Sequence, residues 1–167
     1  MKRGQFTLVF LLMLVAQALL NNYFGLARYV LISVLPVLIL MLPHRMGTIV
    51  AMLVAFASGL AVDFFSTGML GISSLALVPV ALVRGLVLNL VFGEEYSSRD
   101  EELSLDRFGL TKMALAILIL SAMFFLVYIW ADSAGTVGFW PAALRWLLSV
   151  IVSTPVCVYV STLLRRG

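Results

Sequence analysis

Three charged side chains stand within or at the ends of long apolar stretches, where a charge could do chemistry inside a membrane. They are Asp63, Arg84 and Arg145. A charge in hydrocarbon costs roughly 3 kcal/mol on insertion scales, so each of them needs a partner or a role. An acid there can cap a turn, pair with an arginine, contact a partner protein or relay protons. A relay needs several acids in series, and Asp63 is the single acid within these stretches, which disfavours a proton-coupled transporter.

The three charges are expected at different depths. Counting about 1.5 Å per residue along helices, Asp63 and Arg145 lie near the outer face at depths within roughly 5 Å of each other. Arg84 lies nearer the cytoplasm. We therefore expect Asp63 to pair with Arg145 or to cap the turn that follows it, and Arg145 to form a salt bridge. We expect Arg84 to face the interior of the bundle or to extend its head group toward the cytoplasm.

A row of small residues precedes Asp63. Gly47, Ala51, Ala55 and Gly59 recur at every fourth position, which places them on one face of a helix. Small residues let a second helix approach closely, and helices associate in lipid in this way. The spacing therefore predicts a groove that another helix fills.

Residues for catalysis and metal binding are scarce. Cys157 is the one cysteine and His44 the one histidine. This excludes a disulfide within the chain, clusters of cysteine and histidine around a metal, and a Ser-His-Asp triad. The sequence also contains no P-loop and no glycine-rich dinucleotide motif. We expect no catalytic residues, no cofactor and no metal, and therefore a protein that is not an enzyme.

The composition indicates that the bilayer is the solvent of this chain. Hydrophobic residues make up 63% of the 167 positions and charged residues 11%, with a mean hydropathy of +1.13. The apolar residues form long runs instead of alternating, which favours helices over a β-barrel. The net charge of +3 comes from basic residues that flank these runs, so no nucleic acid is expected. The prediction is one all-α integral membrane domain over residues 1–167.

Six apolar runs predict a bundle of six transmembrane helices. They cover about 6–20, 29–42, 47–62, 72–92, 110–130 and 142–164. The second run is short for ~30 Å of hydrocarbon and contains Pro36, a potential kink. The acidic segment 93–109 is expected to be a solvated cytoplasmic loop, with a docking site for a cytoplasmic partner as the alternative.

The first run also fits a signal peptide, because Lys2 and Arg3 precede it and Ala16-Gln17-Ala18 resembles a cleavage site. We interpret it as a span in which Gln17 contacts another helix. The distribution of lysine and arginine then favours both termini in the cytoplasm. With this orientation the outer loops carry only Arg28, and the cytoplasmic side carries Lys2, Arg3, Arg45, Arg99, Arg107, Lys112, Arg165 and Arg166.

The stretch from Gly59 to Ser66, which reads GLAVDFFS, is followed by Leu70 and Gly71. This stretch resembles the rod shape-determining membrane protein MreD family, and its turn motif comprises Asp63, Phe64, Ser66 and Gly71. Residues 35–43 (LPVLILMLP) with Arg45, the small size and the plan of six spans add to the resemblance. The polar segment 93–106 is longer than the usual link in that family.

The resemblance implies a bacterial inner-membrane scaffold without catalysis of its own, in the complex that elongates the cell and builds peptidoglycan. The implied partner is MreC, with the glycosyltransferase RodA, its paired transpeptidase and MreB filaments as wider partners. We hypothesise that the face of Gly47, Ala51, Ala55 and Gly59, or an equivalent face, receives the membrane helix of a partner. Membrane lipid surrounds the protein, and the oligomeric state, including a homodimer, stays open.

The alternative is the substrate-binding subunit (S-component) of an energy-coupling factor transporter for a vitamin. Such subunits are also small bundles of six spans, and the MreD family is distantly similar to them in fold. A binder needs polar and aromatic groups that converge on an outer pocket. The outer loops offer Asn21, Asn22, Tyr23, Arg28, Asp63, Asp132 and Trp140.

Overall fold

The computed structural model describes residues 3–23, 30–43, 46–66, 69–93, 105–133 and 138–166. Every secondary-structure element in these ranges is a helix. The helices are α1 (Arg3–Tyr23), α2 (Leu35–Leu40), α3 (Thr48–Phe65), α4 (Ile72–Phe92), α6 (Leu105–Ser133) and α7 (Phe139–Arg166). Four of them, α3, α4, α6 and α7, contain segments long and apolar enough to cross a membrane. This is the architecture of a multi-pass membrane protein.

The long helices follow the apolar runs of the sequence. The expected span 72–92 coincides with α4, and the other long helices differ from their predicted bounds by a few residues. One difference concerns the polar loop predicted over 93–109, because α6 already begins at Leu105. The rest of that loop, residues 94–104, lies outside the described residues, as do Arg28, His44 and Arg45.

The second predicted span, 29–42, is not a continuous helix. Residues 30–34 are not helical, and α2 has six residues, which rise about 9 Å against ~30 Å of hydrocarbon. Pro36 lies in the first turn of α2, where its missing N–H breaks no helical hydrogen bond. A helix that ran through this proline from residue 29 would lose such a bond. The prediction of six helical spans is therefore not confirmed.

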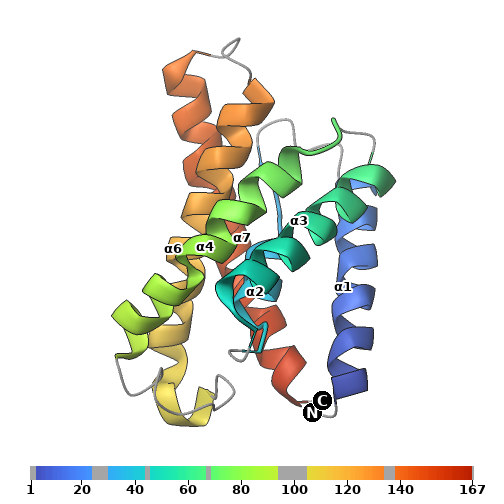
Figure 1. Ribbon diagram of the computed structural model, residues 1–167. Helices are drawn as coiled ribbons and strands as arrows, with labels where there is room; N and C mark the ends of the chain where they lie inside the picture. Colours follow the sequence, from blue (N-terminus) through green and yellow to red (C-terminus); the bar gives the residue numbers. More distant parts are fainter. Residues whose placement is uncertain are drawn as a thin grey trace.

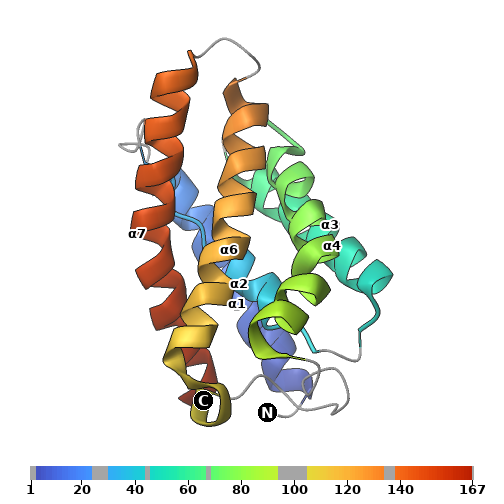
Figure 2. The same ribbon diagram turned by 90° about the vertical axis from the view of Figure 1, so that its left-hand side faces the viewer.

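Two hairpins surround the buried helix α2. In Figure 1, α3 and α4 run diagonally as an antiparallel pair, whereas α1, α6 and α7 stand nearly upright. Figure 2 shows α6 and α7 side by side as the second pair. In both figures, α1 begins and α7 ends at the same end of the bundle. Every residue of α2 is buried between these elements.

The predicted face of small residues packs against α4 of the same chain. Ala51 and Ala55 are 1% and 0% exposed. A Cβ added to Gly59 would lie 2.5 Å from the backbone N and Cα of Ser74 on α4. A helix of the same chain therefore packs on this face at Gly59, and the hypothesis that a partner supplies a helix to this face or an equivalent one stays a prediction. The close approach is already used by α4, and only Gly47, at the start of the row, is exposed.

The outer faces of the helices are apolar. Leu86 and Leu90 on α4 are 69% and 80% exposed, and Trp130 at the end of α6 is 76% exposed. A protein in water would seldom expose so many large apolar side chains in continuous bands. In a bilayer these side chains contact lipid.

Candidate functional site

Asp63 caps the start of α4. Its Oδ2 atom accepts hydrogen bonds from the backbone N–H groups of Gly71 at 2.8 Å and Ser73 at 3.0 Å. The carboxylate is buried, with 5% exposure of the residue, and it lies where the helix dipole favours a negative charge. Gly71 has φ of +99°, a conformation that glycine adopts without strain. Of the two roles predicted for Asp63, capping the turn is the one observed.

The remaining residues of the turn motif have local roles. Phe64 and Phe65 are 73% and 67% exposed, and their rings contact each other edge to face, with centroids 5.5 Å apart. Ser66 Oγ donates to the carbonyl of Val62 at 2.8 Å and accepts from Asn21 Nδ2 at 3.4 Å. The serine therefore ties the end of α3 to α1.

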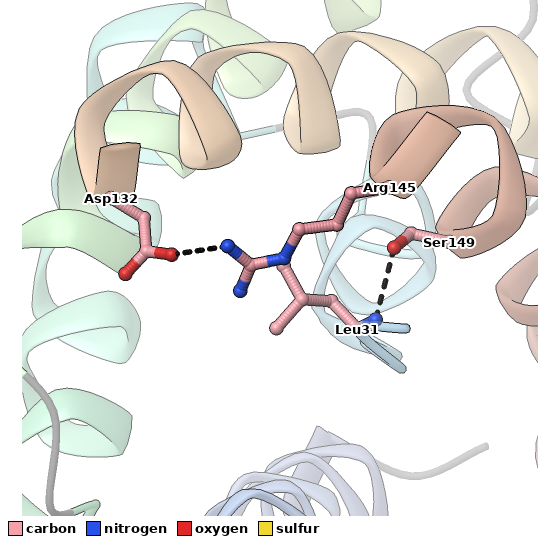
Figure 3. Close-up of polar contacts among 4 residues, drawn as sticks. All are labelled: Leu31, Asp132, Arg145 and Ser149. Carbon is pink, nitrogen blue, oxygen red and sulfur yellow. Dashed lines mark hydrogen bonds and ion pairs between the residues drawn. The ribbon is translucent and has the colours of Figure 1, made fainter. Parts of the chain in front are cut away.

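Arg145 pairs with Asp132, not with Asp63. Its Nη1 atom lies 2.7 Å from Oδ2 of Asp132 (Figure 3). The two side chains are 22% and 35% exposed, so water screens the pair partly. Asp132 lies in the last turn of α6, and α7 packs directly against α6. The salt bridge expected for Arg145 is confirmed. Its acid is Asp132, whereas the similar expected depths of Asp63 and Arg145 had suggested Asp63.

Arg84 faces the interior of the bundle, the first of the two orientations predicted for it. The residue is 4% exposed. Its Nε donates to the carbonyl of Leu40 at 3.3 Å, and its Nη2 donates to the carbonyl of Leu42. The carbonyl of Leu40 belongs to the last residue of α2, and that of Leu42 lies two residues beyond it. The helix dipole is negative at this end, and the last C=O groups lack helical partners. Arg84 therefore satisfies the C-terminal end of the buried short helix.

Polar side chains on both sides hold the non-helical segment 30–34. On the side of α7, Ser149 Oγ accepts from the N–H of Leu31 at 2.9 Å (Figure 3). Ser153 Oγ accepts from the N–H of Ser33 at 3.2 Å and donates to the carbonyl of Leu31 at 3.1 Å. Cys157 Sγ donates to the carbonyl of Ser33 at 3.2 Å. One face of α7 thus replaces the hydrogen bonds of a neighbouring strand.

On the other side of this segment, Gln17 of α1 completes the pairing. Its Oε1 accepts from the N–H of Val34 at 2.8 Å, and its Nε2 donates to the carbonyl of Ile32 at 3.0 Å. Irregular backbone is tolerated at membrane depth only where protein or water satisfies its polar groups. Gln17 was predicted to contact another helix, and it instead bonds backbone groups of a segment that is not helical.

The role of the α7 face was not predicted from the sequence. Ser149, Ser153, Cys157 and Ser161 recur at every fourth position within an apolar helix, and all four are buried. This spacing was a readable signal, because a polar stripe on a lipid-length helix needs partners inside the bundle. What the spacing could not show is that the partner is non-helical backbone.

Two hollows adjoin these groups. One, of about 20 Å³, lies between Gln17, Asn21, Ser33, Ser73 and Tyr128, among others, and has room for about one water molecule. The other, of about 220 Å³, lies beside Arg84, between α3 and α4. Within the described ranges, no group of three or more His, Cys, Asp or Glu side chains could hold a metal ion.

No family model, curated protein or solved structure matches this chain. The resemblance of residues 59–71 to the MreD family therefore stays a prediction. The geometry gives these residues a role in the fold, since they join α3 to α4.

Proposed function

We propose that this chain is a non-enzymatic scaffold subunit of the bacterial cell-elongation complex, which binds MreC and supports peptidoglycan synthesis and cell shape. The observation that carries the proposal is the α3–α4 hairpin. The residues that resemble the family are those that build it, with Gly59 against Ser74 and Asp63 on the N–H groups of Gly71 and Ser73. Because this geometry requires these residue types, other proteins with the same hairpin would share the same short sequence pattern.

A scaffold role is consistent with the way in which the polar groups are used. Asp63, Arg84 and Gln17 all bond to the backbone of the chain itself. Such contacts fix elements relative to one another, as a scaffold requires. RodA, its paired transpeptidase and MreB are proposed as wider partners from the family resemblance alone.

The helix of a partner would need a face other than that of Ala55 and Gly59, because Ala55 is buried and α4 approaches Gly59 closely. The exposed apolar faces of the bundle are the alternatives. Photocrosslinking residues placed singly at Leu53 on α3, Leu86 on α4 and Ile151 on α7, which are 64%, 69% and 58% exposed, would identify the face that contacts MreC.

The proposed location is the bacterial inner membrane, with both termini in the cytoplasm. Two observations support it: the bias of basic residues in the sequence, and the common end at which α1 begins and α7 ends (Figures 1 and 2). Reporter fusions at the two termini that are active only in the cytoplasm or only outside it would test the orientation. Opposite locations of the termini would contradict it.

The function is tested by purification from the native host in mild detergent, followed by mass spectrometry of the proteins that accompany the chain. Recovery of MreC with wall-synthesis enzymes is expected, together with rounded cells after depletion. Recovery of transporter ATPase subunits or of a bound vitamin would instead support the S-component alternative. That alternative finds less support among the described residues, because the hollow beside Gln17 and Tyr128 has about 20 Å³, against ~300 Å³ or more for a typical ligand site.

A further inference from the structure

The turn between α3 and α4 presents large apolar side chains on its outside. Phe64 and Phe65 at the end of α3 are 73% and 67% exposed, and Met69 and Leu70 before α4 are 77% and 67% exposed. We call these four side chains the apolar tip. In water such a cluster would be an unfavourable surface, so its size indicates that something apolar covers it.

The apolar tip continues the lipid-facing surface of its two helices. Phe56 and Leu60 precede it on α3 and are 48% and 37% exposed, and Leu75 follows it on α4 and is 52% exposed. Between residues 46 and 83 the sequence has a single charged residue, Asp63, which is 5% exposed. In the described part of this hairpin, no exposed charge therefore separates the tip from the side chains that contact hydrocarbon.

The polar groups beneath the tip are bonded within the protein. Asp63 Oδ2 accepts from the N–H groups of Gly71 and Ser73. The N–H and the Oγ of Ser66 both donate to the carbonyl of Val62, at 3.0 and 2.8 Å. Backbone at membrane depth requires such internal partners, because hydrocarbon supplies none. This turn is therefore constructed in a way that is compatible with lipid.

The length of α3 also places the tip within the bilayer. Its 18 residues rise about 27 Å, which falls short of ~30 Å of hydrocarbon even for an upright helix, and α3 runs diagonally (Figure 1). One end of α3 must therefore lie below a membrane surface. The helix begins three residues after Arg45 in the sequence, whereas its other end is the apolar tip, so the tip is the end that suits lipid.

The neighbouring helices mark the level of the tip. In both figures the end of α6 and the start of α7 lie above the end of α3 and the start of α4. Trp130 and Trp140, near those ends of α6 and α7, are 76% and 78% exposed, and tryptophan concentrates at membrane interfaces. At the end of α1, Asn21 and Asn22 are exposed, and Asn21 Nδ2 donates to Ser66 Oγ. The tip therefore lies below the aromatic ends of α6 and α7, at a level where amide side chains of α1 can meet head groups.

We propose that the apolar tip is inserted into the lipid leaflet on the side of the α6–α7 connection, which is the outer leaflet in the proposed orientation. Phe64, Phe65, Met69 and Leu70 contact acyl chains just below the head groups, and the turn is not an aqueous loop. A water-soluble domain would then be unable to reach the turn, and a protein could contact it only within the bilayer. The proposal concerns lipid, so it can fail without affecting the proposed scaffold function.

The test measures the depth of the tip by fluorescence quenching. The purified full chain with Met69→Cys is labelled with a bimane maleimide and reconstituted into phosphatidylcholine liposomes; Cys157 is 0% exposed and stays unlabelled in the folded protein. The quenchers are phosphatidylcholine with a doxyl group near the head-group end of an acyl chain, and iodide in the water on both sides. We expect the doxyl lipid to quench the label at Met69 strongly and iodide to quench it weakly.

Two matched variants calibrate this result. Leu86→Cys lies in the middle of α4 at a side chain that is 69% exposed, and it should be quenched by the lipid and not by iodide. Gly138→Cys lies at the start of α7, where the residue is exposed and an added Cβ meets only Pro141 Cδ at 3.7 Å. Iodide should quench this variant more strongly than it quenches Met69→Cys.

Iodide quenching at Met69 as strong as at Gly138 would overturn the proposal, because the turn would then be in water. Lipid quenching at Met69 that disappears as the ratio of protein to lipid rises would also overturn it, since a second copy of the chain would then cover the tip. Leu70→Cys provides the same comparison if Met69→Cys does not give a monodisperse sample. Both side chains are largely exposed, so neither substitution removes packing from the core.

Discussion

The contact between Gly59 and Ser74 predicts how the α3–α4 hairpin responds to a single added methyl group. In Gly59→Ala the new Cβ would lie 2.5 Å from the backbone N and Cα of Ser74 and 2.8 Å from its Oγ. Carbon atoms in contact are normally about 3.5–4.0 Å apart, so the helices must separate by about 1 Å. Backbone atoms cannot rotate away as a side chain can. Overpacking of this kind costs about 1–3 kcal/mol.

The matched control is Gly85→Ala in α4, where the added Cβ meets no atom within 4 Å. Both substitutions replace a helical glycine by alanine, and this replacement by itself stabilises a helix by about 0.5–1 kcal/mol. The difference between the two variants therefore isolates the cost of the close contact. We expect Gly59→Ala to be less stable than Gly85→Ala by about 1–3 kcal/mol.

The assay is reversible unfolding of the purified protein in mixed micelles with increasing denaturing detergent, followed by tryptophan fluorescence. Equal unfolding midpoints for the two variants would refute the reasoning, because they would mean that α3 and α4 do not approach closely at Gly59. A lower midpoint for Gly85→Ala than for Gly59→Ala would refute it more strongly.

Three further predictions use the same unfolding assay or thiol labelling. Asp63→Ala leaves two N–H groups of the turn without their acceptor and should destabilise the protein by about 1–3 kcal/mol; an unchanged midpoint would contradict the cap. Ser153→Ala unpairs backbone groups of the segment 30–34 and should cost about 1–3 kcal/mol, whereas Ser161→Ala, whose hydroxyl bonds only its own helix, should have little effect. Cys157 is 0% exposed, so a maleimide should label it only after unfolding, and rapid labelling of the folded protein would contradict its burial.

The long helices were predictable because lipid sets their length. An apolar run of about 20 residues has few alternatives in a bilayer, and α4 over Ile72–Phe92 coincides with its run. The prediction of a helical span over the second run, residues 29–42, was wrong for a physical reason. The apolar composition of this run cannot distinguish a helix from non-helical backbone, because Ser149 and Ser153 satisfy that backbone from positions 118 and 120 residues away in the sequence.

Partner choice for the charges was only partly predictable. Depth along a helix fixes the height of a residue but not which helices are neighbours, so depth alone could not identify the acid that pairs with Arg145. The short loop between α6 and α7 makes them adjacent, and Asp132 is therefore the acid within reach. Had the partner of Arg145 been sought first on the neighbouring helix of its hairpin, and only then by depth, Asp132 would have been identified.

The small-residue face shows what four-residue spacing does and does not establish about function. The spacing correctly indicates that a helix packs there, but it is equally compatible with a helix of the same chain and one of a partner. The helix of the same chain is favoured, because α4 follows α3 after a short turn and the loss of conformational entropy on bringing the two together is small. Because Ala55 is buried and α4 packs against Gly59, substitutions at these two positions test the fold. Partner binding must then be sought on exposed side chains outside the motif that carries the family resemblance.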